Sequence, residues 1–190
     1  EEWSFGLRYG VEKPTTKCTA FGLPTSSHSE AYAGQNMDIS RWLDGRQTLL
    51  RVMPTAKNNG EITPEVLVFS IAGALGVNGF NRHGLGITCN TLNQEDYDPK
   101  GLPVFFIVRA ILEKSTINEA EDFLRSIPHA SGQNYILSTA DEMRCFECGG
   151  SGVVAYSPTQ WQGKLFHTNH PLVPRPNKTD LPSTPLPGSN

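Results

Sequence analysis

The sequence lacks an excess of basic residues and a long apolar run, and both absences restrict the partners of the protein. Its 190 residues include 16 Lys and Arg against 19 Asp and Glu, which gives a formal net charge of −3. Nucleic acids and anionic membranes select for clustered Lys and Arg, so we expect neither as a partner. The longest uncharged stretch, residues 66–81, is shorter than the roughly 20 apolar residues of a membrane helix and is interrupted by glycines.

Cysteine is also scarce. Cys18, Cys89, Cys145 and Cys148 are too few in 190 residues for a disulfide scaffold. The last two form a single CxxC motif, whereas a zinc site usually needs a second pair of ligands. On a strand, residues three apart point to opposite faces, which also disfavours a local disulfide between them. We therefore expect no metal and no other cofactor.

The 18 glycines and 14 prolines indicate many turns, and most of the chain fits short strands bounded by turn residues. Between residues 102 and 127, apolar residues recur at helical spacing and predict two helices. Pro103 suits the first turn of one helix, and Ser115 or Thr116 with Glu119 predicts a capping box for the other. Together these elements predict one α+β domain with antiparallel sheets. The expected strands are residues 30–39, 47–53, 66–72, 84–92, 134–139, 143–148, 153–157 and 164–168.

The last twenty residues, 171–190, contain six prolines and show no hydrophobic period. They are interpreted as a loop or linker. Because a compact domain rarely ends on a long structureless stretch, we expect the fold to continue beyond residue 190.

Cys18 opens a run of small and β-prone residues, CTAFG, directly after Lys17. Taken alone, a cysteine is most often a small buried hydrophobe, so the roles of filler, metal ligand and nucleophile stay open. A threonine directly after a nucleophile at the start of a strand fits this run, which makes Thr19 a candidate for substrate or oxyanion support. Twenty residues on, Asp38 lies in the alternating segment GQNMDI. Two adjacent antiparallel strands of this length would bring Asp38 back near Cys18.

Two later segments offer amide side chains. The stretch GVNGFNRHGLGITCNTL, residues 76–92, fits a tight hairpin with Asn81 and Asn90 at either end of the strand that follows. The segment FHTNHPL contains His167 and His170, which on a strand face opposite sides and are not expected to share a metal ion. Asn169 between them can donate an N–H to an oxyanion, a role whose loss typically costs about 10²–10³ in rate.

In order and spacing, the segments CTAFG, GQNMDI, GFNRHGLGITCNTL and HTNHPL resemble the acyl-CoA:6-aminopenicillanic acid acyltransferase family of N-terminal nucleophile (Ntn) hydrolases. The same segments resemble bile salt hydrolase more distantly. The resemblance implies a four-layer αββα sandwich with antiparallel sheets, cut just before the nucleophilic cysteine. The implied parts are a segment before the nucleophile, residues 1–17, a core of residues 18–172 and a proline-rich loop or linker, residues 173–190.

The resemblance also implies roles for individual residues. Cys18 is the nucleophile, Asp38 contacts and orients its amino group, and Asn169 completes the oxyanion hole. Asn81 and Asn90 fall in the second and third motifs of the family and are expected to line the site.

Cleavage of the Lys17–Cys18 bond would create the base that the thiol needs. Reference pKa values are about 8.5 for a thiol and about 7.7–8.0 for an α-amine. Because the two values are close, a freed amino group can accept the proton of its own thiol. While Lys17 remains attached, that nitrogen is an amide and cannot accept a proton. The same thiol can attack the Lys17 carbonyl by an N-to-S acyl shift and release residues 1–17 on hydrolysis.

We expect a small-molecule substrate with a linear amide bond or an acyl-CoA-like thioester. The acyl-cysteine formed on it passes to water in a hydrolase and to an amine in an acyltransferase. The chain departs from the family at Lys17, because penicillin-forming members have glycine there. Gln35 stands where bile salt hydrolases have an arginine, which disfavours an anionic bile-acid-type substrate, and a later arginine of those enzymes has no counterpart. The sequence leaves a homo-oligomer open.

Two other functions also stay open. An uncleaved Ntn-like domain would bind a ligand or partner without catalysis, an interpretation that rests mainly on Lys17. A Cys–His peptidase would instead pair Cys18 with one of five histidines. These are His28, His83, His129, His167 and His170.

Overall fold

The computed structural model describes residues 17–25, 30–38, 41–92, 95–96 and 98–174. The segment expected to precede Lys17, the histidine at position 28 and the proline-rich stretch from residue 175 onward lie outside this part of the chain. Among the described residues, no helix combines the length and the apolar character needed to cross a membrane.

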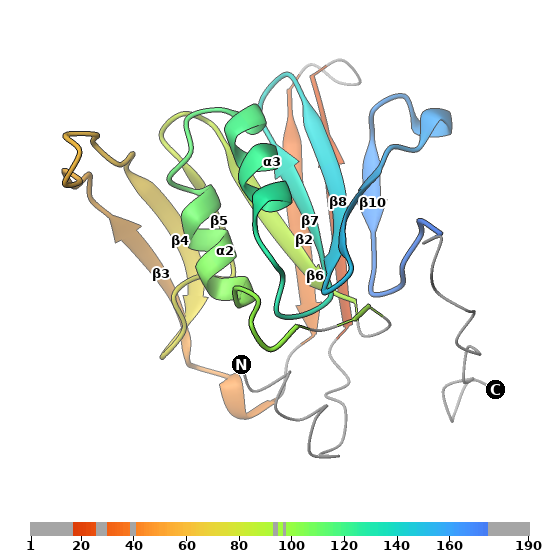
Figure 1. The fold of residues 1–190 in the computed structure, drawn as a ribbon, viewed down its shortest axis with the longest axis horizontal. Helices are drawn as coiled ribbons and strands as arrows, with labels where there is room; N and C mark the ends of the chain where they lie inside the picture. Colours follow the sequence, from red (N-terminus) through yellow and green to blue (C-terminus); the bar gives the residue numbers. More distant parts are fainter. Residues whose placement is uncertain (1–16, 26–29, 39–40, 93–94, 97, 175–190) are drawn as a thin grey trace.

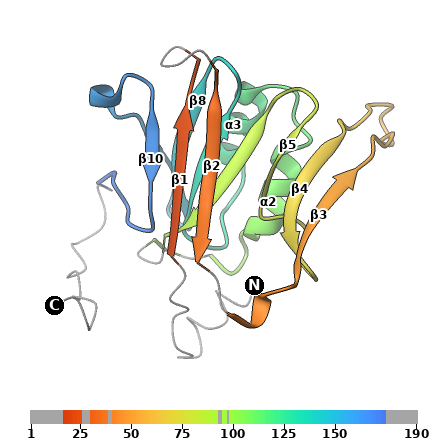
Figure 2. The ribbon, with the colours of Figure 1, turned by 180° about the vertical axis from the view of Figure 1, so that it is seen from behind.

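Two antiparallel sheets lie face to face, and two helices cover the outer face of the larger one (Figure 1). Seen from behind, β1 and β2 lie in front of the larger sheet (Figure 2). The smaller sheet has the strand order β10 (Leu165–His167), β1 (Lys17–Leu23) and β2 (Tyr32–Asp38). The larger sheet has the order β3 (Gln47–Val52), β4 (Val66–Ile71), β5 (Asn78–Asn81), β6 (Gly86–Thr91), β7 (Gln133–Ser138), β8 (Met143–Gly149) and β9 (Gly152–Tyr156). The predicted α+β arrangement with antiparallel sheets is confirmed.

The two predicted helices are α2 (Val104–Ile111) and α3 (Ile117–Ser126). Pro103 occupies the N-cap of α2, one position before its first helical residue. At the start of α3, the Thr116 hydroxyl accepts a hydrogen bond from the Glu119 N–H, and the Glu119 carboxylate accepts one from the Thr116 N–H. This confirms the predicted capping box. The structure also contains two single-turn 3-10 helices, η1 (Arg41–Leu43) and η2 (Thr159–Trp161).

The main hydrophobic core lies between the helices and the larger sheet. Along β4, Val66 and Val68 are buried in this core, whereas Leu67 and Phe69 on the alternate face are half-buried. Every residue of β7 is buried, because this strand has the helices on one side and the smaller sheet on the other. A second apolar cluster joins the two sheets and consists of Ala20, Ile136, Cys145 and Leu165.

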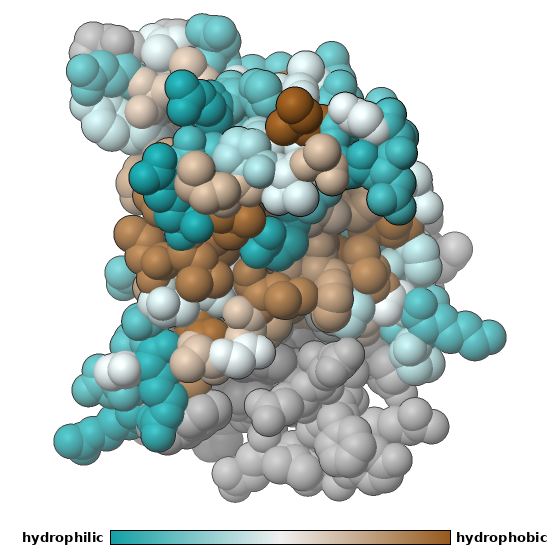
Figure 3. All heavy atoms as spheres, turned by 90° about the vertical axis from the view of Figure 1, so that its left-hand side faces the viewer, coloured by the Kyte–Doolittle hydropathy of each residue, from teal (hydrophilic) through white to brown (hydrophobic). Residues whose placement is uncertain are grey.

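The smaller sheet covers only part of the larger one. Asn78 of β5 donates a hydrogen bond to Gln35 of β2, so the Asn78 side chain lies on the face toward the smaller sheet. Leu49 and Phe80 share that face by register and alternation, yet they are 64% and 55% exposed. Apolar residues gather on the β3 side of the molecule (Figure 3). The described residues therefore leave an apolar surface beside β2.

Candidate active site

Cys18 lies at the start of β1, the central strand of the smaller sheet. Strand alternation buries Cys18 and Ala20 and exposes Lys17 and Thr19, so the thiol faces the larger sheet. Only 8% of the Cys18 surface is exposed. The side chain of Thr19 therefore points away from the thiol, and its role in substrate or oxyanion support stays a prediction.

Asn169 reaches Cys18 because of the register between β1 and β10. Ala20 pairs with His167, so the chain that follows β10 continues antiparallel to β1 and brings Asn169 opposite Cys18. The Asn169 Oδ1 atom accepts a hydrogen bond of 2.5 Å from the Cys18 N–H. The Asn169 Nδ2 atom donates one of 2.8 Å to the carbonyl of Thr91 in β6. These two partners, a donor and an acceptor, define the orientation of the amide group.

Next to this site, part of the β6 edge that faces β5 has no strand partner. Pairing between β5 and β6 ends at the Gly79–Ile87 pair, which leaves the backbone of the following residues without a strand partner on that side. The side chain of Gln35 fills this gap, because its Oε1 atom accepts from the Cys89 N–H at 3.1 Å and its Nε2 atom donates to the Cys89 carbonyl. Gln35 thus replaces a strand at the edge of β6 and links β2 to the larger sheet.

The surroundings of Cys18 hold its thiol in the neutral form. Burial raises the pKa of the Cys18 thiol above its ordinary value. Hydrogen bonds from the Asn169 and Gln35 side chains and from the Thr91 backbone lower this pKa but do not reverse the effect, and the charge of Asp38 raises it slightly. The uncleaved chain therefore presents a protonated thiol at neutral pH, close to amide groups that can stabilise negative charge.

Asp38 lies at the end of β2, directly opposite Lys17 in the β1–β2 pair. It is exposed, and its charge acts on the Cys18 thiol across this pair. The structure thus brings Asp38 to the Lys17–Cys18 peptide bond, as the strand pattern predicts. Its contact with a freed amino group stays a prediction.

Asn90 is fully buried on β6 and supports the segment that carries Asn169. Its Nδ2 atom donates to the carbonyls of His167, at 2.9 Å, and Thr168, at 3.3 Å. Asn90 therefore holds the end of β10 against the larger sheet, and its partners are backbone groups next to the candidate oxyanion donor.

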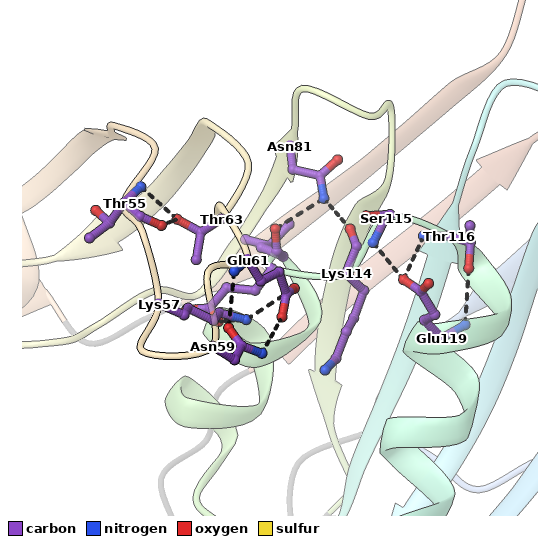
Figure 4. Close-up of polar contacts among 12 residues, drawn as sticks. Thr55, Lys57, Asn59, Glu61, Thr63, Asn81, Lys114, Ser115, Thr116 and Glu119 are labelled. Carbon is purple, nitrogen blue, oxygen red and sulfur yellow. Dashed lines mark hydrogen bonds and ion pairs between the residues drawn. The ribbon is translucent and has the colours of Figure 1, made fainter.

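Asn81 lies on the helical side of the larger sheet (Figure 4). Its Nδ2 atom donates to the carbonyls of Leu112, at 3.0 Å, and Lys114, at 2.7 Å, where α2 ends. Its Oδ1 atom accepts from the N–H groups of His83 and Leu85 in the turn between β5 and β6. These contacts join a hairpin turn to a helix end, so the structure does not bring Asn81 to Cys18.

The cysteines and histidines of the described residues have other partners. Cys145 belongs to the cluster between the sheets and Cys148 to the core under the helices, which confirms that the CxxC thiols point to opposite faces. All four cysteines are free, and no group of three or more metal-binding side chains occurs among the described residues. His167 contacts Glu147, and His129 contacts the Leu124 carbonyl.

Sequence reasoning missed three contributors to the site. These are the pairing of Gln35 with the Cys89 backbone, the backbone amide of Thr91, and a buried contact between Glu147 and His167. At the position of Gln35 the sequence indicates only a departure from bile salt hydrolases. The others have no sequence signal, because a backbone amide carries no residue preference and the buried pair is formed by packing between strands.

Two facing antiparallel sheets with helices on the outer face of one of them have the arrangement of the Ntn-hydrolase fold, an αββα sandwich. The described residues form three of its four layers. A similar solved structure is the N-acylethanolamine-hydrolyzing acid amidase (NAAA) ortholog of Caenorhabditis elegans, with a TM-score of 0.61 and 19% identity over 81% of this chain and 70% of that chain. Penicillin V acylase of Agrobacterium tumefaciens gives a TM-score of 0.57 and 21% identity over 82% of this chain and 53% of that chain.

The chain belongs to the acyl-coenzyme A:6-aminopenicillanic acid acyl-transferase family, whose model matches residues 26–184. A relative in Emericella nidulans, the acyl-coenzyme A:6-aminopenicillanic-acid-acyltransferase 40 kDa form, is 27% identical over 183 residues. The alignment covers 95% of this chain and 48% of the relative, so the chain spans about half of that protein's length. The predicted resemblance is confirmed.

Proposed function

We propose that the protein is an Ntn amidohydrolase or acyltransferase that cuts itself before Cys18 and then uses this cysteine as its nucleophile. The observation that carries the proposal is the set of contacts at Cys18. Asn169 accepts a hydrogen bond from its nitrogen, while Asn169, Gln35 and the Thr91 backbone provide hydrogen bonds at its sulfur. Membership in an acyltransferase family supports the same class of chemistry.

Maturation begins with attack of the Cys18 sulfur on the carbonyl carbon of Lys17. The new C–S bond replaces the C–N bond, the nitrogen of Cys18 gains a proton and becomes an amine, and a thioester joins residues 1–17 to the sulfur. Water then hydrolyses the thioester and releases residues 1–17 as a carboxylic acid. The raised pKa of the thiol in the uncleaved chain makes this first step slow and the freed amine decisive for later turnover.

Turnover uses the freed amine of Cys18 as a general base. The amine takes the thiol proton, the thiolate adds to the substrate carbonyl, and the Asn169 Nδ2 group and the Thr91 backbone amide stabilise the oxyanion. The leaving amine or thiol departs with a proton, and an acyl-cysteine remains. Water or an acceptor amine then takes the acyl group and regenerates Cys18. Asp38, opposite the cleavage point, orients the protonated amine.

The substrate class follows from the groups around the thiol. Gln35 is engaged with the Cys89 backbone and carries no charge, so this position offers no cation to an anionic substrate. We therefore assign a small, linear amide or an acyl thioester as substrate. The functional unit in this proposal is residues 18–172, with residues 173–190 as a linker.

Intact mass measurement of the purified wild type and of Cys18→Ala tests the proposal. We expect a species that begins at Cys18 in the wild type and only the full-length chain in the variant. A screen of N-acyl amino acids, amino-acid amides and penicillins then identifies the acyl group, with the same variant as the inactive control. Full activity of a wild type that retains the Lys17–Cys18 bond contradicts the proposal.

One observation favours a second candidate, a binding domain that stays uncleaved. β1 begins at Lys17, so the bond to be cut lies inside a paired strand, and the Cys18 thiol is buried and protonated. Uncut protein in both the wild type and Cys18→Ala, together with no turnover in the screen, supports this second function.

A further inference from the structure

A row of buried polar side chains crosses the larger sheet behind the candidate site. Asn90 on β6 pairs with Asn134 on β7, and Asn134 pairs with Glu147 on β8, so the three side chains share one face. All three residues are fully buried. A buried carboxylate is costly unless other groups satisfy it, so the partners of Glu147 indicate why it is there.

The carboxylate of Glu147 is surrounded by the segment that carries Asn169. Its Oε1 atom contacts the Nε2 atom of His167 at 2.9 Å and accepts from the Leu172 N–H at 2.5 Å. Its Oε2 atom accepts from the Val173 N–H at 3.3 Å. One carboxylate therefore binds the chain both before and after Asn169.

His167 completes this arrangement. Its Nδ1 atom lies 2.9 Å from the Thr168 carbonyl, which can only accept a hydrogen bond, while its Nε2 atom faces the Glu147 carboxylate. Both ring nitrogens thus face acceptor oxygens. The ring also packs edge-on against Tyr156, with ring centroids 5.8 Å apart, and both members of the His167–Glu147 pair are fully buried.

We propose that Glu147 and His167 are positioning residues that hold the segment 167–173, and with it Asn169, against Cys18. The inference rests on the proposed function for its catalytic consequence, but the geometry stands by itself. Three N–H groups meet the Glu147 carboxylate, the Asn90 amide holds the His167 and Thr168 carbonyls from the other side, and Asn169 lies between these anchors. Neither residue is among the hydrogen-bond partners of the Cys18 thiol, so each acts through Asn169.

The decisive variant is Glu147→Gln in the full chain. A glutamine side chain has one acceptor oxygen, so either the Leu172 N–H or the Val173 N–H loses its acceptor and faces the NH₂ group of the glutamine. The matched control is Glu121→Gln on α3, whose carboxylate likewise contacts two side chains, Arg125 and Arg144, but on the helical side of the larger sheet. We expect Glu147→Gln to lower both the rate of self-cleavage and kcat by about tenfold or more, a loss that approaches the one caused by removal of an oxyanion donor. We expect KM to change by less than about twofold.

A spectroscopic readout separates positioning from general loss of structure. In protein labelled with ¹⁵N-asparagine, the side-chain amide signal of Asn169 is assigned by its loss in Asn169→Asp. We expect this signal to shift in Glu147→Gln and to stay in place in Glu121→Gln, while the side-chain signal of Asn81 stays in place in both. If Glu147→Gln does not fold, His167→Gln tests the same pair from β10, because it keeps a donor toward Glu147 and loses the contact with Thr168.

The outcomes distinguish this inference from the proposed function. An active wild type with an unchanged kcat and an unmoved Asn169 signal in Glu147→Gln overturns the positioning role. Equal losses in Glu147→Gln and Glu121→Gln overturn it as well. A wild type that neither cleaves nor turns over amides defeats the proposed function alone, and the Asn169 signal still decides whether the pair positions this residue.

Discussion

The Asn169 side chain bonds to the backbone nitrogen of Cys18 across 151 positions of the sequence. The same amide reaches β6 through the Thr91 carbonyl, so it joins the smaller sheet to the larger one at the nucleophile. In the uncleaved chain the nitrogen of Cys18 is a peptide N–H, and after cleavage it is the proposed base. The single side chain of Asn169 therefore contacts the proposed base, the Cys18 nitrogen, and also lies beside the Cys18 sulfur.

Asn169→Asp is expected to abolish most of the activity while preserving the size of the side chain. The aspartate can still accept from the Cys18 nitrogen, but it cannot donate to an oxyanion and places a negative charge beside the Thr91 carbonyl. We expect self-cleavage and kcat to fall by about 10²–10³, as for the loss of an oxyanion donor. Asn59→Asp, at the exposed turn between β3 and β4, is the matched control. Comparable rates in the Asn169 variant and the wild type would refute an oxyanion role.

Gln35→Ala is expected to affect both the thiol and the sheet edge. The hydrogen bond from Gln35 lowers the pKa of Cys18, so its removal raises that pKa further and slows alkylation of Cys18 by iodoacetamide at pH 8. The lost pairing also leaves the N–H and carbonyl of Cys89 without partners, which we expect to lower the free energy of unfolding by about 1–3 kcal/mol. Mass-resolved alkylation against pH and urea denaturation measure the two effects. Gln47→Ala on the exposed side of β3 is the control and should change neither.

Asn81 and Asn169 show how far the sequence alone could predict the site. Both are asparagines in family motifs, yet Asn169 meets Cys18 and Asn81 joins the β5–β6 turn to the end of α2. Asn81 ends β5 with its side chain on the helical face of the larger sheet, whereas Asn169 lies just after β10. β5 (Asn78–Asn81) is too short and too polar to be predicted from its own residues. Local patterns did predict α2, α3 and the capping box at Thr116, because these depend on neighbours within one or two turns.

The contacts that shape the site lie beyond such local patterns. Gln35 meets the backbone of Cys89, 54 positions away, and Glu147 meets His167, 20 positions away. Each contact arises where two sheets pack together, and the sequence near either partner does not encode the other. Glu147 lies inside the CxxC motif, a pattern that indicates a role for the two thiols and none for the carboxylate between them.

Asn81→Ala is expected to destabilise the protein without changing its chemistry. The variant loses hydrogen bonds to the Leu112 and Lys114 carbonyls and to the His83 and Leu85 N–H groups. Because several of these backbone groups are left unpaired, we expect the free energy of unfolding to fall by about 2–4 kcal/mol, measured by urea denaturation. The value of kcat per folded molecule should be unchanged. A large fall in kcat with unaltered stability would instead place Asn81 in the catalytic machinery.

Cys89 is expected to make the fold sensitive to alkaline pH. Burial, with a smaller contribution from the charge of Cys18, raises the pKa of Cys89 to about 12 in the folded protein, against an ordinary value of 9.0. The unfolded chain therefore releases this proton first as the pH rises. The stabilising effect is fully present below about pH 9 and declines between about pH 9 and pH 12, by up to about 1.4 kcal/mol per pH unit.

Cys89→Ser isolates this effect because serine does not titrate in the range and its hydroxyl can still donate to the Val77 carbonyl, as the Cys89 thiol does at 3.2 Å. The pKa of Tyr135 is also raised, mainly by burial, with smaller contributions from the charges of Cys148 and Cys89. The burial effect is common to both proteins and cancels in their difference, and only the smaller contribution from the Cys89 charge is lost in the variant. Urea unfolding at pH 8, 9, 10 and 11 should therefore show a free energy of unfolding that falls more steeply with pH in the wild type than in the variant. The difference in slope should reach up to about 1.4 kcal/mol per pH unit, which corresponds to one proton. Parallel pH dependences in the two proteins would mean that the thiol ionises equally well in the folded and unfolded states, and hence that water reaches Cys89 beneath the Gln35 pairing.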